Sequence, residues 1–395
     1  MATFSVRFLG CKVSHNDAHE VREALLHDGH VQRDDAAEVA VVNGCCVTHE
    51  AVRKSRQAVA RAARTHARVY VTGCAANLEG AFAGMPDNVM VVARASEETP
   101  AFVAGDVGAI GCVHHDARLE RIRAFVKVQD GCSFSCTFCV VPLVRGPSRS
   151  RPAGVVLAEV RRRVAQGHRE VVLTGINLGC YRDRAERRSL PDLIRAVGQT
   201  PGLARLRLSS IEINHVTEEL VRALRETPTA GRHLHVPLQS GDDSVLRDMA
   251  RRYSAETYLR RLEPLADFNL TTDVIVGFPS EDERAFARTL AVVAQAGITK
   301  VHVFPYSPRP GTATAARDTV PPPVKKERSA RLRAASQAAC EAWWRTKVGR
   351  EDVVLLDRPG RGYGDDYSPW LVEAAVGELV PVRGKAVTEE GIVAA

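Results

Sequence analysis

The sequence of 395 residues predicts an α/β protein in three parts: a doubly wound parallel α/β domain, a partial (βα)6 TIM-type barrel and a small C-terminal β-barrel. Short apolar runs alternate with helical periodicity over residues 1–100, and the same alternation recurs six times over residues 115–310. After residue 350, short strand-like runs separated by glycine turns predict the small β-barrel.

In the N-terminal part, strands are expected at residues 4–10, 39–43 and 69–73, and helices at residues 16–27 and 48–65. Strands that alternate with helices favour a parallel sheet, because a parallel connection needs a crossover segment. The helices then cover both faces of the sheet.

In the central part, six apolar runs are the expected strands, with helical stretches between them. They cover residues 124–129, 170–175, 204–210, 233–238, 271–278 and 300–306. Six successive βα units indicate a curved parallel barrel that does not close. Prolines 321–323 form a stiff break, and a helix rich in Ala, Arg and Lys is expected from Val324 to about Lys347. The predicted domains are residues 1–105, 115–323, 324–350 (a basic linker helix) and 351–395.

Composition narrows the class of protein. No apolar run reaches the ~18 residues of a membrane helix, and the N-terminus lacks the regions of a signal peptide, so we expect a cytoplasmic protein without a membrane partner. In a reducing compartment, the ten cysteines more often bind metal or do chemistry than form disulfides. The net charge of +7 is compatible with a polyanionic partner without requiring one.

One group of cysteines has the spacing C-x3-C-x2-C and comprises Cys132, Cys136 and Cys139, directly after the first barrel strand. Loops at the carboxyl ends of parallel strands line active sites. Three thiolates can hold three irons of a 4Fe-4S cube and leave one iron open. That iron can chelate the amino and carboxylate groups of S-adenosylmethionine, and the reduced cluster can cleave its sulfonium. The alternatives are buried structural thiols and a zinc site completed by Cys112 or by His114 or His115.

A second group of cysteines is dispersed along the chain. Cys11, Cys45 and Cys74 each stand within about two residues of the end of a predicted strand. Because the ends of neighbouring parallel strands converge on one crevice, three thiolates would meet there and hold a second cluster with an open iron. The alternative is that small buried cysteines are simply common at strand ends. Cys46 adjoins Cys45, and periodicity does not choose between them.

The chain resembles, along nearly its whole length, the methylthiotransferase family of radical S-adenosylmethionine enzymes. The segments that match include FLGCKVSHNDAHE, VVNGCCVTHEAVRKSRQ, VTGCAAN, VQDGCSFSCTFCVVPLVRGPSRSR, LTGINLGCY, HLHVPLQSGDDSVLRDMARRY, DVIVGFPSEDE and FPYSPRPGT. The resemblance implies an N-terminal domain with an auxiliary cluster, a radical barrel and a C-terminal TRAM module. The family's Asn-x-Cys-x-Val-Thr pattern falls on Asn43 to Thr48, which makes Cys45 the ligand and leaves Cys46 where threonine is usual.

The resemblance also implies a reaction. One S-adenosylmethionine would methylate sulfur held at the auxiliary cluster. A second, cleaved at the other cluster, would give a radical that removes hydrogen from C2 of an adenine, where acid–base catalysis has little grip. KSRQ, LTGINLGCY, LSSIE and SPRPGT look most like the branch acting on N6-threonylcarbamoyladenosine, 3′ of the anticodon in tRNA. Alternatives are isopentenyl-adenosine in tRNA, a ribosomal protein side chain, or a non-catalytic iron–sulfur or zinc RNA-binding protein.

That reaction implies further partners: the anticodon stem-loop of tRNA, an external one-electron donor and a sulfur donor. Other candidate cofactor-binding residues lie in the cluster loop or at strand ends: Phe138, Thr174, Gly175, Asn177, Glu212 and Gln239. Phe138 could instead only shield the cluster, and Glu212 could be a solvated loop carboxylate. The remaining cysteines, Cys46, Cys112, Cys180 and Cys340, are assigned to ordinary packing.

The candidate RNA-binding residues are Arg145, Arg149 and Arg151, which follow the cluster loop and could meet phosphates while the target base enters the barrel. The alternative is a merely solvated basic loop. Residues 351–395 carry four basic and nine acidic side chains, a poor electrostatic match to phosphate. Either Tyr363 or Tyr367 stacks on RNA, or the linker helix contacts the phosphates.

Overall fold

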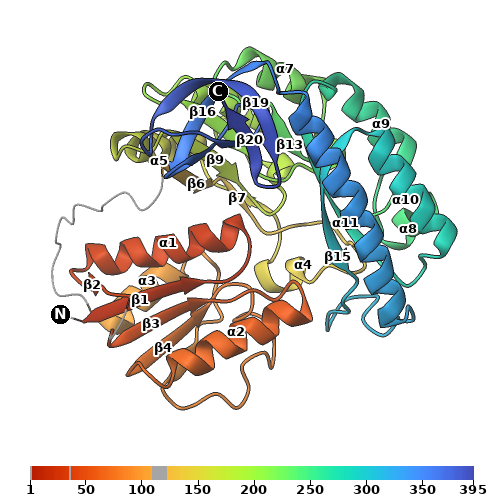
Figure 1. Ribbon diagram of the computed structural model, residues 1–395. Coiled ribbons are helices and arrows are strands. Elements are labelled where there is room, and N and C mark those ends of the chain that lie inside the picture. Colours follow the sequence, from red (N-terminus) through yellow and green to blue (C-terminus); the bar gives the residue numbers. More distant parts are fainter. Residues whose placement is uncertain (1, 35–36, 109–121) are drawn as a thin grey trace. The chain divides into compact units, whose positions relative to one another are not determined.

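The computed structural model describes residues 2–34, 37–108 and 122–395, and Figure 1 shows its helices and strands. The chain divides into two compact units. The first contains the N-terminal sheet together with residues 130–149 and 307–316, and the second contains residues 122–129, 150–306 and 317–395. The grouping of the 130–149 segment with the N-terminal sheet was not predicted. The predicted domain boundary near residue 110, and with it Cys112, His114 and His115, lies outside the described residues.

The core of the first unit is a five-stranded parallel sheet with the order β2-β1-β3-β4-β5. Its strands are β1 (Thr3–Phe8), β2 (Val31–Gln32), β3 (Val39–Asn43), β4 (Arg68–Thr72) and β5 (Val89–Val91). Its helices are α1 (Lys12–His27), α2 (His49–Ala62), α3 (Thr99–Val107) and the short α4 (Val141–Arg145). This order confirms the doubly wound prediction.

Alternation along β3 explains why helices cover both faces of the sheet. Val39 and Val41 pack with α1 and α3, whereas Ala40 and Val42 pack with α2 on the other face. Figure 1 shows α1 and α2 on opposite faces. A strand that is buried on both faces reads as a continuous apolar run, and this is why its boundaries are those predicted. Helix α2 begins after Thr48, whose hydroxyl accepts a hydrogen bond from the backbone N–H of Ala51 at 3.1 Å.

The second unit contains a partial barrel of six parallel strands, with helices between them. The strands are β6 (Arg123–Lys127), β9 (Glu170–Thr174), β12 (Arg205–Leu208), β13 (His233–His235), β14 (Asn269–Val276) and β15 (Ile298–Pro305). Two three-stranded sheets, β12-β9-β6 and β13-β14-β15, are joined by parallel bridges such as Ser210 to His235. Each strand overlaps its predicted run. Strand β13 is shorter than predicted, since Pro237 has no N–H to donate.

Smaller elements lie between these strands, and two of them (β7 and β8) span the points where the chain passes from one unit to the other. They are β7 (Gln129–Asp130), β8 (Arg149–Ser150), α5 (Ala153–Ala165), η1 (Leu178–Cys180), β10 (Arg182–Asp183), β11 (Arg188–Ser189), α6 (Leu190–Gly198), η2 (Ile213–His215), α7 (Glu218–Glu226), α8 (Asp243–Asp248), α9 (Ala255–Leu262), η3 (Glu263–Leu265) and α10 (Glu283–Gln295). Buried aliphatic side chains of these helices and of the six strands form one continuous core.

A long helix and a closed five-stranded barrel follow. Helix α11 (Pro322–Arg345) starts inside the proline run rather than after it, because the first turn of a helix needs no N–H from proline. The barrel has the order β16-β17-β18-β20-β19 and encloses Trp370. Its strands are β16 (Glu351–Arg358), β17 (Arg361–Tyr363), β18 (Pro369–Leu371), β19 (Leu379–Thr388) and β20 (Gly391–Ala394). The predicted C-terminal barrel is confirmed.

Within the second unit, a buried carboxylate organises the contact between the two barrels. Glu170 begins β9, is 1% exposed, and pairs with Arg123 and with Nε of Arg207 at 2.9 Å. Arg207 donates through Nη2 to the Gly364 carbonyl at 2.7 Å, and Arg205 donates to the Tyr363 carbonyl at 2.8 Å. The small barrel therefore caps the amino-terminal ends of the parallel strands.

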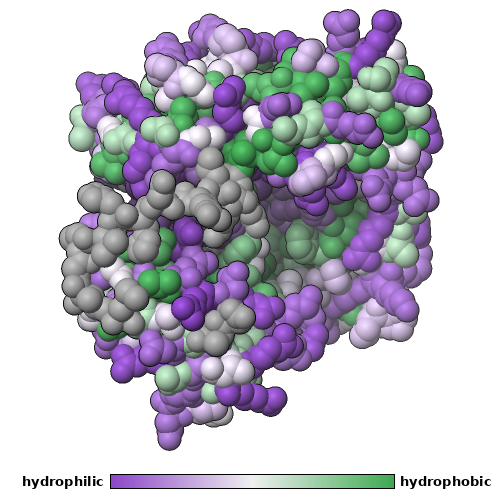
Figure 2. Space-filling view, turned by 60° about the vertical axis from the view of Figure 1, so that its left-hand side comes forward, coloured by the Kyte–Doolittle hydropathy of each residue, from purple (hydrophilic) through white to green (hydrophobic). Residues whose placement is uncertain are grey.

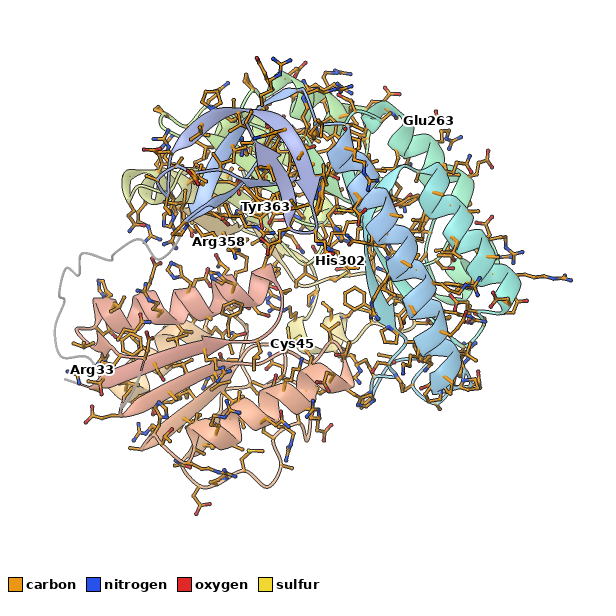
Figure 3. The ribbon with its side chains drawn as sticks, viewed as in Figure 1. Arg33, Cys45, Glu263, His302, Arg358 and Tyr363 are labelled. Atoms are coloured by element: carbon orange, nitrogen blue, oxygen red, sulfur yellow. The ribbon has the colours of Figure 1, made fainter. Side chains whose placement is uncertain are left out.

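The same contact accounts for the two tyrosines considered for RNA stacking. Tyr363 (labelled in Figure 3) stacks on Tyr367 with ring centroids 4.7 Å apart. The Arg123 guanidinium lies 5.0 Å from the Tyr367 ring centroid, and Arg207 lies 4.7 Å from it. Of the alternatives considered for the RNA contact, stacking on Tyr367 is therefore corrected, because its ring is already covered by guanidinium groups.

The surface face in Figure 2 is largely hydrophilic, with smaller apolar patches between charged groups. None of the helices in the described ranges combines the length and the apolar character that crossing a bilayer requires.

Replacing Glu170 by Gln should release the small barrel from the parallel strands. The change leaves three arginines around a neutral group, and breaking a buried ion pair costs about 3–5 kcal/mol. Denaturation followed by tryptophan fluorescence measures it, because Trp343, Trp344 and Trp370 all pack in or against the small barrel. Glu219→Gln, at an exposed ion pair, should cost under ~1 kcal/mol.

The effect should also depend on pH. Burial opposes the charged form of Glu170, but the arginines outweigh it and lower its pKa below the ordinary 4.5. Its stabilising effect is therefore present above the ordinary pKa and disappears as pH falls through the lower, folded-state pKa. A difference between parent and variant that stays constant down to pH 3 would contradict this account.

Candidate active site

The dispersed group of cysteines lies at the carboxyl edge of the parallel sheet of the first unit. Cys11 follows β1, Cys45 follows β3 and Cys74 follows β4, each two or three residues after the strand ends. The strand order reverses between β1 and β3, and the crevice at such a point is where open α/β sheets bind ligands. Figure 3 labels Cys45 at this edge. The sheet therefore brings together three thiols that are far apart in sequence.

Two glycines let these cysteine segments approach each other. Gly10 has φ +129°, and a Cβ at this position would lie 3.1 Å from the Cβ of Cys45 and 2.9 Å from the hydroxyl of Ser14. Gly73 has φ +79°, and a Cβ there would lie 2.5 Å from the side-chain oxygen of Asn43. Only glycine adopts these backbone angles without strain. The Gly-Cys pairs therefore have a packing reason.

The two adjacent cysteines are both buried and both are coupled electrostatically to Cys74. Burial, with a further contribution from the charges of Cys74 and Cys11, raises the pKa of the Cys45 thiol to about 11. Cys46 is fully buried in the apolar cluster on the α2 face and forms a hydrogen bond with Cys74. That bond, together with Arg145, lowers the pKa of Cys74 to about 7. Both adjacent cysteines therefore lie close to Cys74, and the choice of Cys45 as the ligand stays a prediction.

This donor set fits an iron–sulfur cluster, since cysteine thiolates are the ligands that such clusters use. A cavity of about 410 Å³ adjoins Cys74 and is lined by Asn43, Asp130 and Arg149, among others. The side-chain oxygen of Asn43 is buried without a hydrogen-bond partner. Across the ranges that the structure covers, no three His, Cys, Asp or Glu side chains converge closely enough for a single metal ion. A four-iron cube carries its thiolates on separate corner irons.

The C-x3-C-x2-C loop lies between β7 and α4, in the same unit as the sheet. The backbone N–H of Cys132 donates to the Gly146 carbonyl at 3.0 Å, and Phe134 N–H points at the Cys132 sulfur at 3.5 Å. Thr314 donates to the Thr137 carbonyl through both its N–H and its hydroxyl. All three cysteines and Phe138 are partly exposed. The loop therefore has an anchored backbone and partly exposed cysteines.

A residue that binds RNA should face solvent, but Arg145 does not. It is 9% exposed, and its guanidinium contacts Cys74, Asp17 and Asp130. Burial alone would lower the pKa of Arg145, but these three groups raise it well above its usual value. The RNA-binding prediction for Arg145 is therefore corrected. Arg149 stays a candidate, with a side chain 38% exposed beside Glu97.

Arg151 belongs to the second unit. Its side chain is 30% exposed and pairs with Glu159 at 2.8 Å. It also donates to the Lys127 carbonyl at 2.8 Å. An RNA contact would therefore have to share a guanidinium that is already partly engaged.

Predicted cofactor-binding residues of the second unit lie at carboxyl ends of the barrel strands. The Thr174 hydroxyl and the Asn177 side-chain oxygen are buried without hydrogen-bond partners. Gly175 packs on Gln129, and a Cβ there would lie 2.9 Å from the Gln129 side-chain oxygen. The Asn177 N–H donates to that same oxygen at 2.8 Å. These unsatisfied groups fit a polar ligand at this edge.

The side chain of Glu212 and the backbone of Gln239 each have defined contacts. Glu212 is buried, accepts from the N–H of Asn214 at 2.9 Å and pairs with Arg251 at 3.3 Å. It is therefore not a solvated loop carboxylate. Gln239 has φ +67°, and its N–H donates to the Asp273 carbonyl at 2.8 Å. A positive φ at a residue other than glycine is strain of the kind found at ligand sites.

Sequence reasoning missed a polar cluster on the inner face of the barrel strands, in which His302 is exposed. His235 lies 3.2 Å from the carboxylate of Asp273, and its ring centroid lies 5.5 Å from that of His302. Asp273 and His302 are register partners on β14 and β15. Val301 packs into the core that includes Leu332 of α11, so by alternation His302 (labelled in Figure 3) lies on the opposite, inner face. Polar residues that alternate within apolar strands were the signal for this cluster.

Comparison with known proteins agrees with this geometry. Residues 3–93 match the uncharacterized protein family UPF0004, and residues 126–293 match the radical SAM superfamily. A threonylcarbamoyladenosine tRNA methylthiotransferase MtaB from Thermotoga maritima is 33% identical over 427 residues, which cover 100% of this chain and 96% of the relative. The chain belongs to the radical S-adenosylmethionine methylthiotransferase family. Enzymes of this class use a 4Fe-4S cluster and S-adenosylmethionine, which is the chemistry predicted from the C-x3-C-x2-C loop.

Other relatives of this methylthiotransferase carry two different substrate names. The MtaB of Bacillus subtilis is 35% identical, covering 99% of this chain and 87% of the relative. A tRNA-2-methylthio-N(6)-dimethylallyladenosine synthase from Sorangium cellulosum is also 35% identical, covering 92% and 84%. Sequence identity therefore does not decide between the threonylcarbamoyladenosine and the dimethylallyladenosine branches of the family.

Solved structures show the same fold at low identity. The radical S-adenosylmethionine methyltransferase TsrM from Kitasatospora setae, with cobalamin and a [4Fe-4S] cluster bound, has a TM-score of 0.58 at 13% identity. It covers 80% of this chain, which covers 77% of it. The cobalamin-dependent radical enzyme OxsB has a TM-score of 0.54 at 9% identity, covering 86% and 58%.

Gly10→Ala should damage the auxiliary cysteine site more than an ordinary surface glycine change. The new Cβ meets Ser14 and Cys45 in a disfavoured conformation, and such strain costs about 1–3 kcal/mol. Gly80→Ala, with φ +69° and open space around it, should cost about 1 kcal/mol. Thermal unfolding compares the two variants. Equal losses would mean that the Gly10 segment is not packed against Cys45.

Proposed function

We propose that this methylthiotransferase adds a methylthio group to C2 of N6-threonylcarbamoyladenosine, 3′ of the anticodon in tRNA. The observation that carries the proposal is the presence of two cysteine trios in one compact unit. Cys11, Cys45 and Cys74 line the edge of its sheet, and the C-x3-C-x2-C loop is packed into that unit. Two clusters in one unit suit a reaction that must both form a radical and hold sulfur.

Each trio would hold one 4Fe-4S cluster with an open iron. When bound, these clusters and S-adenosylmethionine supply the one-electron chemistry that C2 of adenine requires. The protein's own contribution is geometric. In the second unit, Thr174 and Asn177 would offer unsatisfied polar atoms to the cofactor, Gly175 lets this loop pack on Gln129, and Gln239 would offer its backbone. Phe138, in the cluster loop of the first unit, would offer its ring.

The role of Glu212 would be indirect unless its contacts rearrange. Its two oxygens already accept from Asn214 and pair with Arg251. In this arrangement the carboxylate holds the loop after β12. To bind the cofactor, one of its oxygens would also have to accept a hydrogen bond from a cofactor amino or hydroxyl group. We therefore keep Glu212 as a cofactor-binding proposal with a structural contribution.

RNA would be held by few charges. Arg149 and Arg151 remain the proposed phosphate contacts, and both are partly engaged by Glu97 and Glu159. The small C-terminal barrel has net charge −5 over residues 351–395. Helix α11 carries exposed basic residues and is the better candidate for the additional phosphate contact. An external one-electron donor and a sulfur donor complete the proposed partners.

The threonylcarbamoyl branch rests on sequence motifs, namely KSRQ, LTGINLGCY, LSSIE and SPRPGT. Three relatives named for that substrate cover 99–100% of this chain. The dimethylallyladenosine synthases are 33–35% identical and cover 92–98% of it, so they are the rival substrate class.

Nucleoside analysis decides between the two branches. In a host that lacks both activities, expression of this chain should produce the methylthio derivative of threonylcarbamoyladenosine and none of the dimethylallyl derivative. The Cys132→Ala variant serves as the inactive control. Appearance of only the dimethylallyl product would sink the substrate assignment while leaving the chemistry intact.

Iron counting tests the two clusters. After anaerobic reconstitution the parent should hold about eight irons per chain. Cys45→Ala should remove about four irons and still cleave S-adenosylmethionine under reduction, because the C-x3-C-x2-C loop is untouched. The matched neighbour Cys46→Ala should keep about eight. If Cys46→Ala loses the iron and Cys45→Ala does not, the ligand is the other cysteine.

A further inference from the structure

Arg145 is the last residue of the short helix α4, and each arm of its guanidinium meets a different partner. Its Nε donates to the sulfur of Cys74 at 2.9 Å. Its Nη2 donates to Asp17 of α1 at 2.7 Å, and its Nη1 donates to Asp130 at 3.0 Å. Its side chain is 5% exposed, and those of Asp17 and Asp130 are 6% and 9% exposed. The group is therefore a buried, fully engaged cation beside a thiol proposed to bind the auxiliary cluster.

The geometry of this group needs arginine. A guanidinium carries its donors in a rigid fork and stays charged, whereas a lysine ammonium is a point charge on a flexible stem. Three partners on three different segments (Asp17 on α1, Cys74 after β4 and Asp130 on β7) fix the fork on all sides. The two carboxylates together carry a charge of −2, which exceeds the single positive charge of Arg145. The buried guanidinium therefore needs no counter-ion from solvent.

Asp130 connects this cation to the other cysteine loop. One Asp130 oxygen accepts from the N–H of Gly131 at 2.7 Å, and the other accepts from the Ser96 hydroxyl. Cys132 follows Gly131 directly in the chain. A single guanidinium thus links the sulfur of Cys74 to the residue that precedes the C-x3-C-x2-C loop.

We propose that Arg145 is a positioning residue that holds the Cys74 thiolate through an N–H···S bond, raises the reduction potential of the auxiliary cluster and ties that cluster to the loop of the radical cluster. The inference rests on the proposed auxiliary cluster. Hydrogen bonds to cluster sulfurs and nearby positive charge stabilise the reduced, more negative state. Residues that orient metal ligands affect metal affinity about 10–100-fold.

The test uses full-length reconstituted protein and four samples: parent, Arg145→Met, Arg145→Lys and Arg53→Met. The last removes an exposed arginine of the same unit that pairs with Glu50 at the surface. Redox titration followed by electron paramagnetic resonance gives the midpoint potentials. The triple variant Cys132→Ala, Cys136→Ala, Cys139→Ala identifies the signal of the auxiliary cluster. Loss of iron to a chelator measures how firmly each cluster is held.

Arg145→Met should shift the auxiliary cluster to a more negative potential and speed its loss to the chelator about tenfold or more. Arg145→Lys keeps a charge but loses the fork, so its shift should have the same sign and be smaller, and Arg53→Met should match the parent. Should the Met variant not fold, the Lys variant carries the comparison. If Arg145 variants that retain about eight irons have the same midpoint potential and the same rate of iron loss as the parent, the role proposed for Arg145 is wrong, whereas the auxiliary cluster is unaffected. A parent with only four irons would overturn the auxiliary cluster itself, and that result appears before any substitution is made.

Discussion

Parallel strand pairing is the constraint on which the candidate active site depends. All strands of a parallel sheet run the same way, so all their carboxyl ends lie at one edge. Backbone hydrogen bonds between β1, β3 and β4 therefore bring Cys11, Cys45 and Cys74 to one place, although more than sixty residues separate the first from the last. Glycines before two of these cysteines then let the loops approach without a clash.

Buried charge is the second organising feature, and it occurs twice. In the second unit, Glu170 holds the amino-terminal ends of three strands to the small barrel through Arg123, Arg205 and Arg207. In the first unit the signs are exchanged, and Arg145 is held by two carboxylates and a thiol. In both, the cost of desolvating an ion is offset by several fixed partners. The charged group around Glu170 holds the fold together, whereas the charged group around Arg145 lies at the proposed site of chemistry.

The contrast between the two cysteine groups shows why a sequence pattern predicts one of them more directly than the other. Cys132, Cys136 and Cys139 are local, so their spacing alone predicted a common ligand. The dispersed trio needed the added premise that strand ends converge, and the choice of Cys45 over Cys46 needed the family pattern. The structure does not make that choice by itself, since Cys45 and Cys46 are both buried and both are electrostatically coupled to Cys74.

The sequence by itself determined the strands, the alternation with helices and the three-part architecture, because these follow from local apolar periodicity and turn residues. It also placed candidate residues at strand ends. Only the tertiary structure decided which charged side chains are free. Arg145 and Tyr367 read as surface groups in sequence, yet Arg145 is buried and the Tyr367 ring is covered by arginines from distant parts of the chain. The cluster of His235, Asp273 and His302 likewise emerges only when neighbouring strands come into register. Local pattern sets the path of the backbone, whereas the partner of a long polar side chain depends on packing between segments that no local pattern records.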